Sequence, residues 1–348
     1  MFLVMIVLFL LICTYQYISS SQNRKTDKKE YIVDSPRHDK KKYIVSIEGN
    51  IGAGKTRLCR LFESQYASKI IIMKEEVNTL FLDQFYRDGK KYGFAMQMCM
   101  LKSRIFNYNL SSVLFNYQNE KQYAMMDRSM FGDLVFATAN HHLNNISNDE
   151  FHIYKHELSG DISSLDTCLD KYPIDLFIYL DQSPELCYDR VVNMRKNHYE
   201  KDISLSYFKL IDDIHFAMML KICSSDKSRV IIHSPSDNEP SHIILQKINQ
   251  VLNNEIEPAT VEFKQRLNVQ EPSCSFIYDK SMIKKDGSIS VKEHYLSPFA
   301  DHFKNIYIPS NFMINQKIDH HIPVYDKSIK KMILKHLSMG QKVIFFDS

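Results

Sequence analysis

The sequence of 348 residues lacks the features that mark several specialised classes of protein. Its seven cysteines are an odd number, lie far apart and form no Cys-x-x-Cys pair, which argues against a disulfide framework and against a zinc site. The formal net charge is only +3, so the composition does not require a nucleic-acid partner, and we expect none. Trp is absent and no internal repeat is visible, although 44% of the residues are hydrophobic. Such a chain can form one large domain with an appendage, or two domains.

Long apolar runs are also lacking, except at the start of the chain. Residues 1–13 carry no charge and residues 14–18 continue the run more weakly, whereas a spanning helix needs about 20 residues. Eight basic and four acidic residues follow between Arg24 and Lys42. This excess of positive charge favours a cytoplasmic location for the part of the chain that follows the apolar run. We therefore expect a membrane anchor over residues 1–18, a polar basic linker over residues 19–42, and a folded domain in the cytoplasm. A cleaved signal and a reading frame that starts too far upstream are the alternatives.

Short β-rich runs alternate with helical stretches from residue 43 onward. The runs are residues 43–47, 69–73, 123–126, 174–180 and 229–233. This alternation predicts βαβ units, and therefore an α/β fold in which helices flank a five-stranded parallel sheet. Between the second and third runs, residues 93–118 form one predicted helix, on which Gln97, Leu101 and Arg104 share a face.

The pattern breaks down after residue 253. Residues 254–348 contain short β-like runs at 275–278, 288–291 and 305–308, and they close with a helix followed by a strand. We expect a main domain over residues 43–253 and a small C-terminal α+β extension over residues 254–348, for which the sequence indicates no role.

The segment that follows the first β-rich run matches the phosphate-binding pattern G-x-x-x-x-G-K-[ST] in full. Its residues are Gly49, Asn50, Ile51, Gly52, Ala53, Gly54, Lys55 and Thr56. The glycines allow backbone N–H groups to face phosphate oxygens, Lys55 supplies a positive charge, and the Thr56 hydroxyl can bind Mg²⁺. Because strand, loop and helix occur in the required order, we expect ATP and Mg²⁺ to bind here.

Further polar motifs follow the next three runs. Lys74-Glu75-Glu76-Val77 provides a carboxylate that can accept a proton from an attacking hydroxyl. Asp127-Arg128-Ser129 provides an acid that can hold Mg²⁺ through water and an arginine that can clamp a reacting group. After the fourth run come three closely spaced basic residues, Arg190, Arg195 and Lys196.

Together these motifs resemble those of the deoxynucleoside kinase family, over about residues 43–252. The resemblance implies a P-loop kinase fold and ATP-dependent phosphorylation of a deoxynucleoside at its 5′-hydroxyl. It places the general base at Glu75, while Glu76 stands where the family has a proline and remains the alternative base. The further roles that the resemblance implies are catalysis by Arg128 and Arg190, ATP binding by the phosphate loop and Arg195, and Mg²⁺ binding by Thr56 and Asp127. It also implies that Arg190, Arg195 and Lys196 belong to a lid that closes over ATP, where their charges offset that of the transferring group and water is excluded.

The resemblance also implies how the nucleoside binds. Tyr86 and Glu200 match residues that bind the sugar 3′-hydroxyl. Gln97 matches the amide that binds the base, since an amide offers a donor and an acceptor together. Arg104 and Asp133 stand where members that prefer cytidine or purines carry an Arg–Asp pair, which leaves less room for a 5-methyl group. Deoxycytidine or a purine deoxynucleoside is therefore favoured, and thymidine remains possible.

Some positions depart from the family pattern. Leu80 stands where the family has a Trp, and Met96 replaces a Phe. We expect these two residues, together with Met100, to reshape the base pocket. The family also dimerises through helices beside the substrate site, so a homodimer is a further expectation.

Two other functions remain open at this point. A thymidylate-type monophosphate kinase would carry Arg-Glu-Pro after the second strand, with the arginine on a substrate phosphate, and Lys74-Glu75-Glu76 lacks that arginine. A membrane-tethered interaction module on a kinase fold is the other alternative, although a chain without catalysis would more often have lost one of the catalytic residues.

Overall fold

The computed structural model describes residues 41–346 apart from several gaps. The gaps are residues 76, 78, 119, 161–164, 196, 235–240, 265–274, 278–304, 310–312, 319–321 and 326. The predicted anchor, most of the predicted linker, Glu76, Lys196 and the β-like run at 288–291 lie outside the described residues. Within the described ranges, no helix has the length and apolar character needed to cross a membrane.

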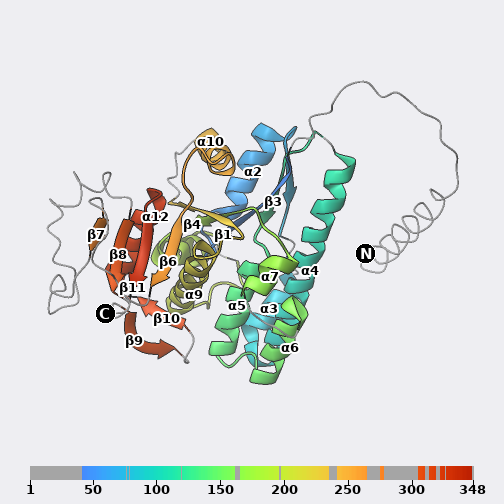
Figure 1. Cartoon of the computed structure of the whole chain (residues 1–348). Helices are drawn as coiled ribbons and strands as arrows, with labels where there is room; N and C mark the ends of the chain where they lie inside the picture. The colour runs from blue at the N-terminus through green and yellow to red at the C-terminus, as the bar shows by residue number, and fades with distance from the viewer. Residues whose placement is uncertain are drawn as a thin grey trace. The chain divides into compact units, whose positions relative to one another are not determined.

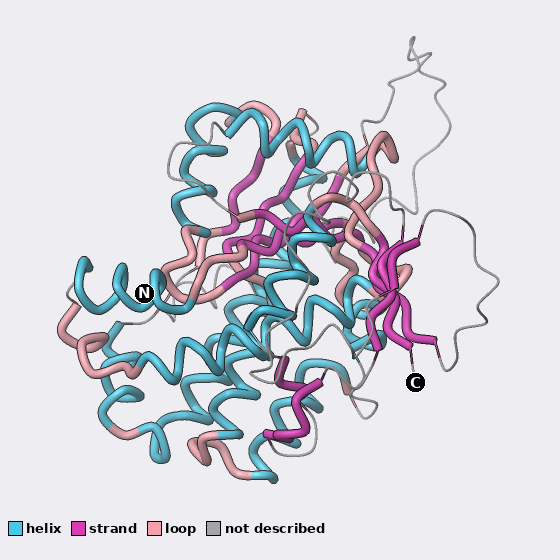
Figure 2. The backbone as a smooth tube through the Cα atoms, turned by 90° about the vertical axis from the view of Figure 1, so that its left-hand side faces the viewer, coloured by secondary structure: helices cyan, strands magenta, loops and turns pink. Residues whose placement is uncertain are grey.

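The centre of the fold is a five-stranded sheet with the order β2-β3-β1-β4-β5. Figure 2 shows magenta strands in the interior with cyan helices around them. Its strands are β1 (Tyr43–Gly49), β2 (Ile70–Met73), β3 (Tyr123–Asp127), β4 (Leu176–Leu180) and β5 (Arg229–His233). All neighbouring strands pair in parallel, so their carboxyl ends lie at the same edge of the sheet. The predicted sheet is confirmed, and the loop after β1 leaves from the edge where ligands bind in open α/β folds.

Helices cover both faces of this sheet (Figure 1). Helices α2 (Lys55–Tyr66) and α10 (Ser241–Leu252) pack on one face, with Val45 and Ile47 of β1. Helices α4 (Gly89–Tyr117), α5 (Met130–His142) and α9 (Leu205–Cys223) pack on the other. Burial on both faces explains why the strands are continuous apolar runs.

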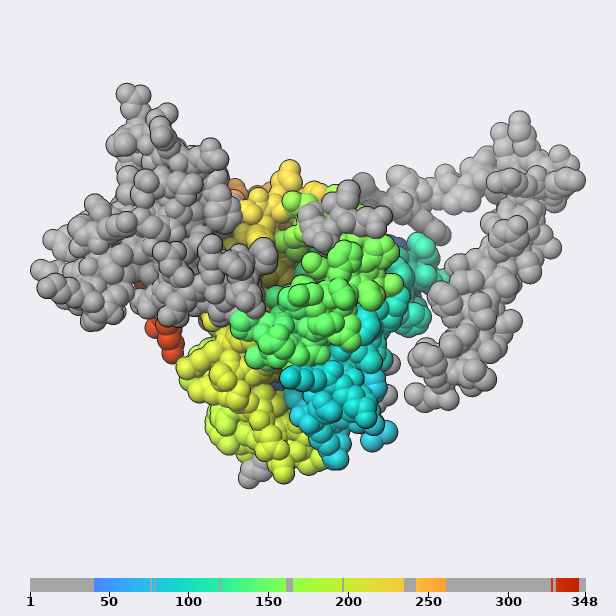
Figure 3. Space-filling view, turned by 90° about the horizontal axis from the view of Figure 1, so that it is seen from below, coloured from blue at the N-terminus to red at the C-terminus, as the bar shows by residue number. Residues whose placement is uncertain are grey.

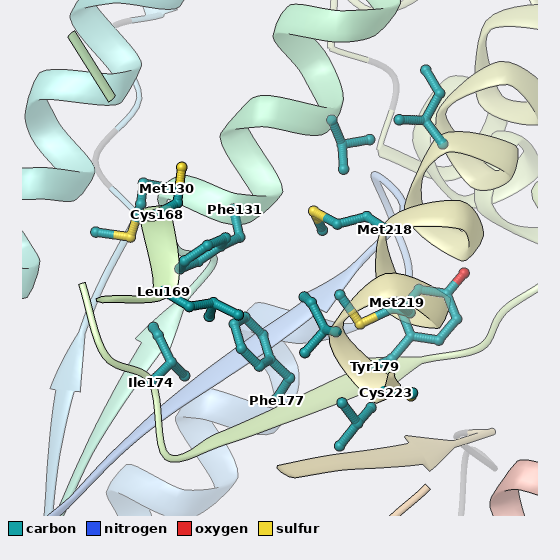
Figure 4. Packing of buried hydrophobic residues seen from close by; sticks show 14 of the residues in the cluster. Met130, Phe131, Cys168, Leu169, Ile174, Phe177, Tyr179, Met218, Met219 and Cys223 are labelled. Atoms are coloured by element: carbon teal, nitrogen blue, oxygen red, sulfur yellow. The ribbon is translucent and has the colours of Figure 1, made fainter. Parts of the chain in front are cut away.

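The core on the α5–α9 face is built from aromatic rings and methionines (Figure 4). The rings of Phe131 on α5 and Phe177 on β4 meet edge to face with centroids 5.4 Å apart, an arrangement that aromatic pairs prefer. Met130, Met218 and Met219 fill the space around them, as flexible thioethers do in irregular cores.

Five shorter helices, among the residues that the structure describes, complete the main domain. They are α3 (Thr79–Arg87), α6 (Asn148–Ser159), α7 (Leu165–Lys171), α8 (Pro184–Tyr188) and a π-helix (Asp189–Arg195). In the space-filling view, the cyan segment of α3 and α4 lies beside the green segment of α5 and α6 (Figure 3).

Helix α4 begins at Gly89, four residues before the predicted start, because the Asp88 side chain caps it by accepting from the Lys91 backbone N–H. Gln97, Leu101 and Arg104 are all buried, which confirms the predicted face.

The C-terminal extension contains a second, four-stranded parallel sheet with the order β6-β11-β8-β7. Its strands are β6 (Thr260–Lys264), β7 (Ser275–Ile277), β8 (Asn305–Pro309) and β11 (Lys342–Phe346). An antiparallel pair, β9 (Met313–Ile318) and β10 (Ile322–Tyr325), precedes helix α12 (Lys327–Ser338). The predicted runs at 275–278 and 305–308 and the closing helix and strand are therefore confirmed.

Helix α12 packs into the main domain. Ile333, Leu334 and Leu337 belong to the same apolar cluster as the buried side chains of α9. The Lys330 ammonium forms ion pairs with Asp212 and, at 3.2 Å, with Asp213 of α9.

We predict that Lys330→Met lowers the free energy of unfolding. The Lys330 and Asp212 side chains are only 10% and 11% exposed, so removal of the ammonium leaves a carboxylate buried without its charge partner. Loss of one partner of a buried pair costs about 3 kcal/mol. Urea denaturation of the full chain measures this, with Lys331→Met, on the exposed side of α12, as the matched control. Equal unfolding midpoints for the two variants would contradict a stabilising role for the buried ion pairs.

Candidate active site

The phosphate loop joins β1 to α2 and is held from two sides. The Asn50 side chain accepts from the Ile51 N–H at 2.8 Å and donates to the Phe208 carbonyl of α9 at 2.8 Å. Gly52 has φ +76°, and a Cβ there would lie 2.9 Å from the Cys187 carbonyl. Gly54, with φ +105°, turns the chain into α2. The glycines of the motif thus supply the left-handed conformations and the close approach that this turn requires.

Lys55 folds back over the loop. Its Nζ donates to the Asn50 carbonyl at 2.8 Å and to the Gly49 carbonyl at 3.1 Å. Burial, and secondly the charge of Arg128, lower the pKa of Lys55 to about 8, while nearby carboxylates oppose that shift. A phosphate group at the loop would provide the anionic partner that a buried ammonium lacks.

Thr56 and Asp127 meet beside the loop. The Thr56 hydroxyl donates to Asp127 Oδ2 at 2.7 Å, and Asp127 Oδ1 is buried with no hydrogen-bond partner. Mg²⁺ needs one or two carboxylates together with substrate phosphates, so this oxygen pair fits the ion. Among the residues that the structure describes, no cluster of three or more His, Cys, Asp or Glu forms a separate metal site.

Arg128 links the phosphate loop to Glu75 at the end of β2. Its Nη2 donates to the Gly49 carbonyl at 2.9 Å, and its Nε lies 3.6 Å from Glu75 Oε1. The guanidinium stacks on the Phe136 ring at 4.5 Å from the ring centre. The backbone of Arg128 is left-handed, with φ 71°, an uncommon conformation that a non-glycine residue adopts only when its surroundings enforce it.

Two residues that sequence reasoning missed hold Arg128 in place: Glu48 bonds the backbone that follows it, and His215 contacts its guanidinium. Glu48 Oε1 accepts from the Ser129 N–H at 2.9 Å and the Ser129 hydroxyl at 2.6 Å. Its Oε2 lies 3.8 Å from Arg128 Nη1. A Cβ at Gly132 would lie only 2.1 Å from that oxygen, so this helix position admits only glycine. The sequence did offer a signal that could have pointed to Glu48, namely an acidic residue near the end of a mostly apolar strand.

His215 is the second missed residue. Its Nδ1 is 2.9 Å from the Ile211 carbonyl and donates to it, so Nε2 is the acceptor for Arg128 Nη1 at 3.2 Å. Burial, and secondly Arg128, hold the pKa of His215 well below its ordinary value, which keeps the ring neutral. A histidine in the apolar α9 pattern gave no signal that distinguishes it from a core residue.

Glu75 lies at the end of β2 and faces two arginines. Its Oε1 pairs with Arg104 Nη2 and lies 3.6 Å from Arg128 Nε. Burial alone would raise the pKa of Glu75, but Arg104, Arg128 and Lys55 outweigh it, and the pKa is lowered. The carboxylate is therefore ionised at neutral pH, as a proton acceptor must be.

The predicted Arg104–Asp133 pair is present. Arg104 Nη1 lies 2.8 Å from Asp133 Oδ1, and the same oxygen accepts from Gln97 Nε2 at 2.9 Å. Asp133 Oδ2 accepts from the Tyr154 hydroxyl at 2.7 Å. Burial raises the pKa of Asp133, an effect that Arg104 and these hydrogen bonds oppose.

The predicted lid residues Arg190 and Arg195 both lie on the π-helix. Arg190 Nη1 donates to the Gly52 carbonyl at 3.3 Å, while Arg195 Nη1 lies 3.9 Å from Glu200 Oε1. Glu200 is buried and also accepts from Asn197 Nδ2 at 2.7 Å. Burial, followed by the neighbouring Tyr207 and Glu200, raises the pKa of Tyr86 well above its ordinary value.

A cavity of about 830 Å³ brings most of these residues together, a volume suited to a small-molecule substrate. The predicted residues that line it are Ile51, Gly52, Gly54, Lys55, Thr56, Glu75, Tyr86, Gln97, Arg104, Arg128, Asp133, Arg195 and Glu200. Those outside its lining are Gly49, Asn50, Ala53, Asp127 and Arg190.

The expected contribution of Leu80 to the pocket was wrong. Leu80 is 78% exposed and does not line the cavity, because the first turn of α3 directs it to solvent. Val77, Thr79 and Leu82 line that stretch instead, and Met96 and Met100 line the cavity as expected.

The parallel sheet, the phosphate loop after β1 and the carboxylates facing arginines define a P-loop kinase. The family model for deoxynucleoside kinases matches residues 45–257, and the chain belongs to the deoxynucleoside kinase family.

Individual relatives share less than a third of their residues with this chain. A deoxyguanosine kinase of Dictyostelium discoideum is 30% identical over 66% of this chain and 76% of its own length. A fowlpox virus protein named as a probable deoxycytidine kinase is 31% identical over 49% of this chain and 69% of its own length. The structure of a deoxyadenosine kinase from M. mycoides with bound dATP aligns with a TM-score of 0.47 at 22% identity, over 60% of this chain and 99% of that one.

We predict that Arg104 controls the pH dependence of the reaction. With the pKa of Glu75 lowered, the rate at saturating nucleoside should stay level from neutral pH down to the ordinary carboxylate pKa of about 4.3. Arg104→Gln removes the closest positive charge but leaves Glu75 desolvated, so its pKa rises and the acid limb of kcat moves to higher pH. Lys102→Gln, an exposed position on the same helix, is the control. Superimposable pH profiles for the two variants would show that Glu75 is not the titrating base.

Proposed function

We propose that this protein transfers the γ-phosphoryl group of ATP to the 5′-hydroxyl of a deoxynucleoside, and that it favours deoxycytidine or a purine deoxynucleoside over thymidine. The observation that carries the proposal is the position of Glu75. Its carboxylate lies 3.6 Å from Arg128 Nε, and it lines the same cavity as Lys55 and Thr56. A base, two phosphate-loop residues and an anion-binding arginine therefore face one space.

Each group has a part in the transfer. Glu75 accepts the proton of the 5′-hydroxyl as the new O–P bond forms and the bond to the leaving ADP breaks. Lys55 and the loop hold the phosphates, and Arg128 and Arg195 offset the negative charge on the transferring group. Thr56 and Asp127 would hold Mg²⁺, which supplies further neutralisation of phosphate charge when it is bound. Arg190, through its contact with Gly52, supports the loop from the lid.

The nucleoside would occupy the remainder of the cavity. Tyr86 and Glu200 both line it and are close enough to influence each other's charge, which suits joint binding of the 3′-hydroxyl. Gln97, Arg104 and Asp133 line the part that would receive the base. The buried Arg104–Asp133 ion pair occupies volume beside Gln97, and this bulk is the basis of the proposed preference against a 5-methyl group.

The monophosphate kinase alternative is less well supported. Lys74 stands where such enzymes would need an arginine on the substrate phosphate. Its side chain is 62% exposed, pairs with Glu63 at 2.9 Å and does not line the cavity.

The first test is a phosphorylation panel of the full chain with ATP–Mg²⁺ and each of the four deoxynucleosides. We predict that Glu75→Gln lowers kcat by about 100-fold or more, with a much smaller change in nucleoside KM, because a general base acts in the transition state. Glu63→Gln is the matched control, since it removes an exposed carboxylate near the same strand end. Nearly equal kcat values for Glu75→Gln and Glu63→Gln would rule out Glu75 as the base.

We also predict a change of nucleoside preference in the double variant Arg104→Met, Asp133→Ala. Both members of the buried Arg104–Asp133 pair are removed together, so neither leaves the other unpaired, and space opens beside the base. Glu75 also loses Arg104 but keeps Arg128 Nε at 3.6 Å, so the ratio between two nucleosides is the quantity to compare. The ratio of kcat/KM for thymidine to that for deoxycytidine should rise about tenfold or more. If steady-state kinetics gives the wild-type ratio, the assignment of the base pocket is wrong.

A further inference from the structure

Helix α9 supports the candidate active site at two points. The Phe208 carbonyl accepts from Asn50 Nδ2 of the phosphate loop at 2.8 Å. Two turns further along the helix, His215 Nε2 accepts from Arg128 Nη1 at 3.2 Å. Both hydrogen bonds are buried. The position of α9 therefore affects how both the phosphate loop and Arg128 are held.

Between these two points, α9 carries a buried carboxylate that the C-terminal extension neutralises. Lys330 Nζ of α12 forms an ion pair with Asp212 and, at 3.2 Å, a second one with Asp213. The same ammonium lies 5.2 Å from the centre of the Phe216 ring. Burial raises the pKa of Asp212, and the Asp213 charge acts in the same direction, whereas Lys330 opposes both effects. Lys330 thus allows two adjacent carboxylates to lie on a packed helix.

The neutralised carboxylate and the histidine that contacts Arg128 are close neighbours. Asp212 and His215 are one turn apart on the same face of α9, and Tyr179 of β4 lies against both. The Tyr179 hydroxyl donates to Asp212 Oδ1 at 3.3 Å, and its ring centre lies 6.2 Å from that of His215. Burial, followed by the charge of Arg128, lowers the pKa of His215, and Lys330 contributes in the same direction. Lys330 therefore acts on the part of α9 that contacts Arg128.

We propose that Lys330 of the C-terminal extension is a positioning residue for Arg128. This inference rests on the proposed function, in which Arg128 offsets negative charge on the transferring group. Without the ammonium, Asp212 is buried without its charge partner, and α9 has to shift to bring the carboxylate to water. A shift of about 0.5 Å at His215 would lengthen its 3.2 Å contact with Arg128 beyond hydrogen-bonding distance.

Lys330→Met tests the proposal in the full chain. For any deoxynucleoside that the wild type phosphorylates, kcat should fall about tenfold or more, because small displacements of a catalytic group are costly. Nucleoside KM should change little, since Tyr86, Gln97 and Asp133 lie on α3, α4 and α5. Rates are expressed per folded molecule, at a temperature where circular dichroism shows the native state. Lys331→Met, on the exposed side of α12, is the matched control and should keep the wild-type kcat.

Two combinations separate positioning from a general loss of stability. Lys330→Met together with Asp212→Asn leaves no unpaired carboxylate at residue 212 and should recover most of the lost kcat. In a His215→Leu background, Lys330→Met should lower kcat little further, because the contact through which it acts is already absent. If Lys330→Met does not fold, Lys330→Gln, which keeps a hydrogen-bond donor for Asp212 without the charge, takes its place in both combinations.

The outcomes distinguish this inference from the proposed function. A folded Lys330→Met variant with the wild-type kcat refutes the positioning role. An equally large loss of kcat in the presence and absence of His215 refutes it as well, and so does a double variant with Asp212→Asn that is as slow as Lys330→Met alone. A wild-type chain that phosphorylates no deoxynucleoside would overturn the proposed function itself.

Discussion

Arg104 joins the end of β2 to helix α5, because its one guanidinium pairs with carboxylates from these two distant segments. Asp133 lies on α5 and Glu75 follows β2, and both are close to the arginine, which is itself buried. Buried charges are costly unless they are paired, so the burial of Asp133 depends on Arg104. The same guanidinium keeps Glu75 ionised. Asp133 and Glu75, to which we assign base binding and proton acceptance, therefore share one source of positive charge.

Arg128 makes a similar connection beside the phosphate loop. It contacts the Gly49 carbonyl, approaches Glu75 and lies over Phe136, and it does so from a left-handed backbone. Glu48, Ser129 and Gly132 stabilise that backbone by hydrogen bonds and by the absence of a side chain at residue 132. The uncommon backbone conformation of Arg128 is thus maintained by buried contacts of the residues around it.

Helix α9 connects this site to the C-terminal extension. His215 on α9 accepts a hydrogen bond from Arg128, and Asp212, one turn earlier, pairs with Lys330 of α12. The extension therefore contributes to the core that supports Arg128. This physical connection gives residues near the end of the chain a structural role, although their sequence carried no functional motif.

The sequence alone determined the features that depend on local spacing. The phosphate loop is contiguous, the five strands are apolar runs, and the shared face of Gln97 and Arg104 follows from helical periodicity. The tertiary structure alone decided which distant groups meet. Arg128 and His215 are 87 residues apart, Gln97 of α4 meets Asp133 and Asn140 of α5, and Leu80 points to solvent although its position in the chain suggested the pocket. Backbone geometry fixes neighbours a few residues apart, whereas these contacts depend on how helices pack across the sheet, which no periodic pattern encodes.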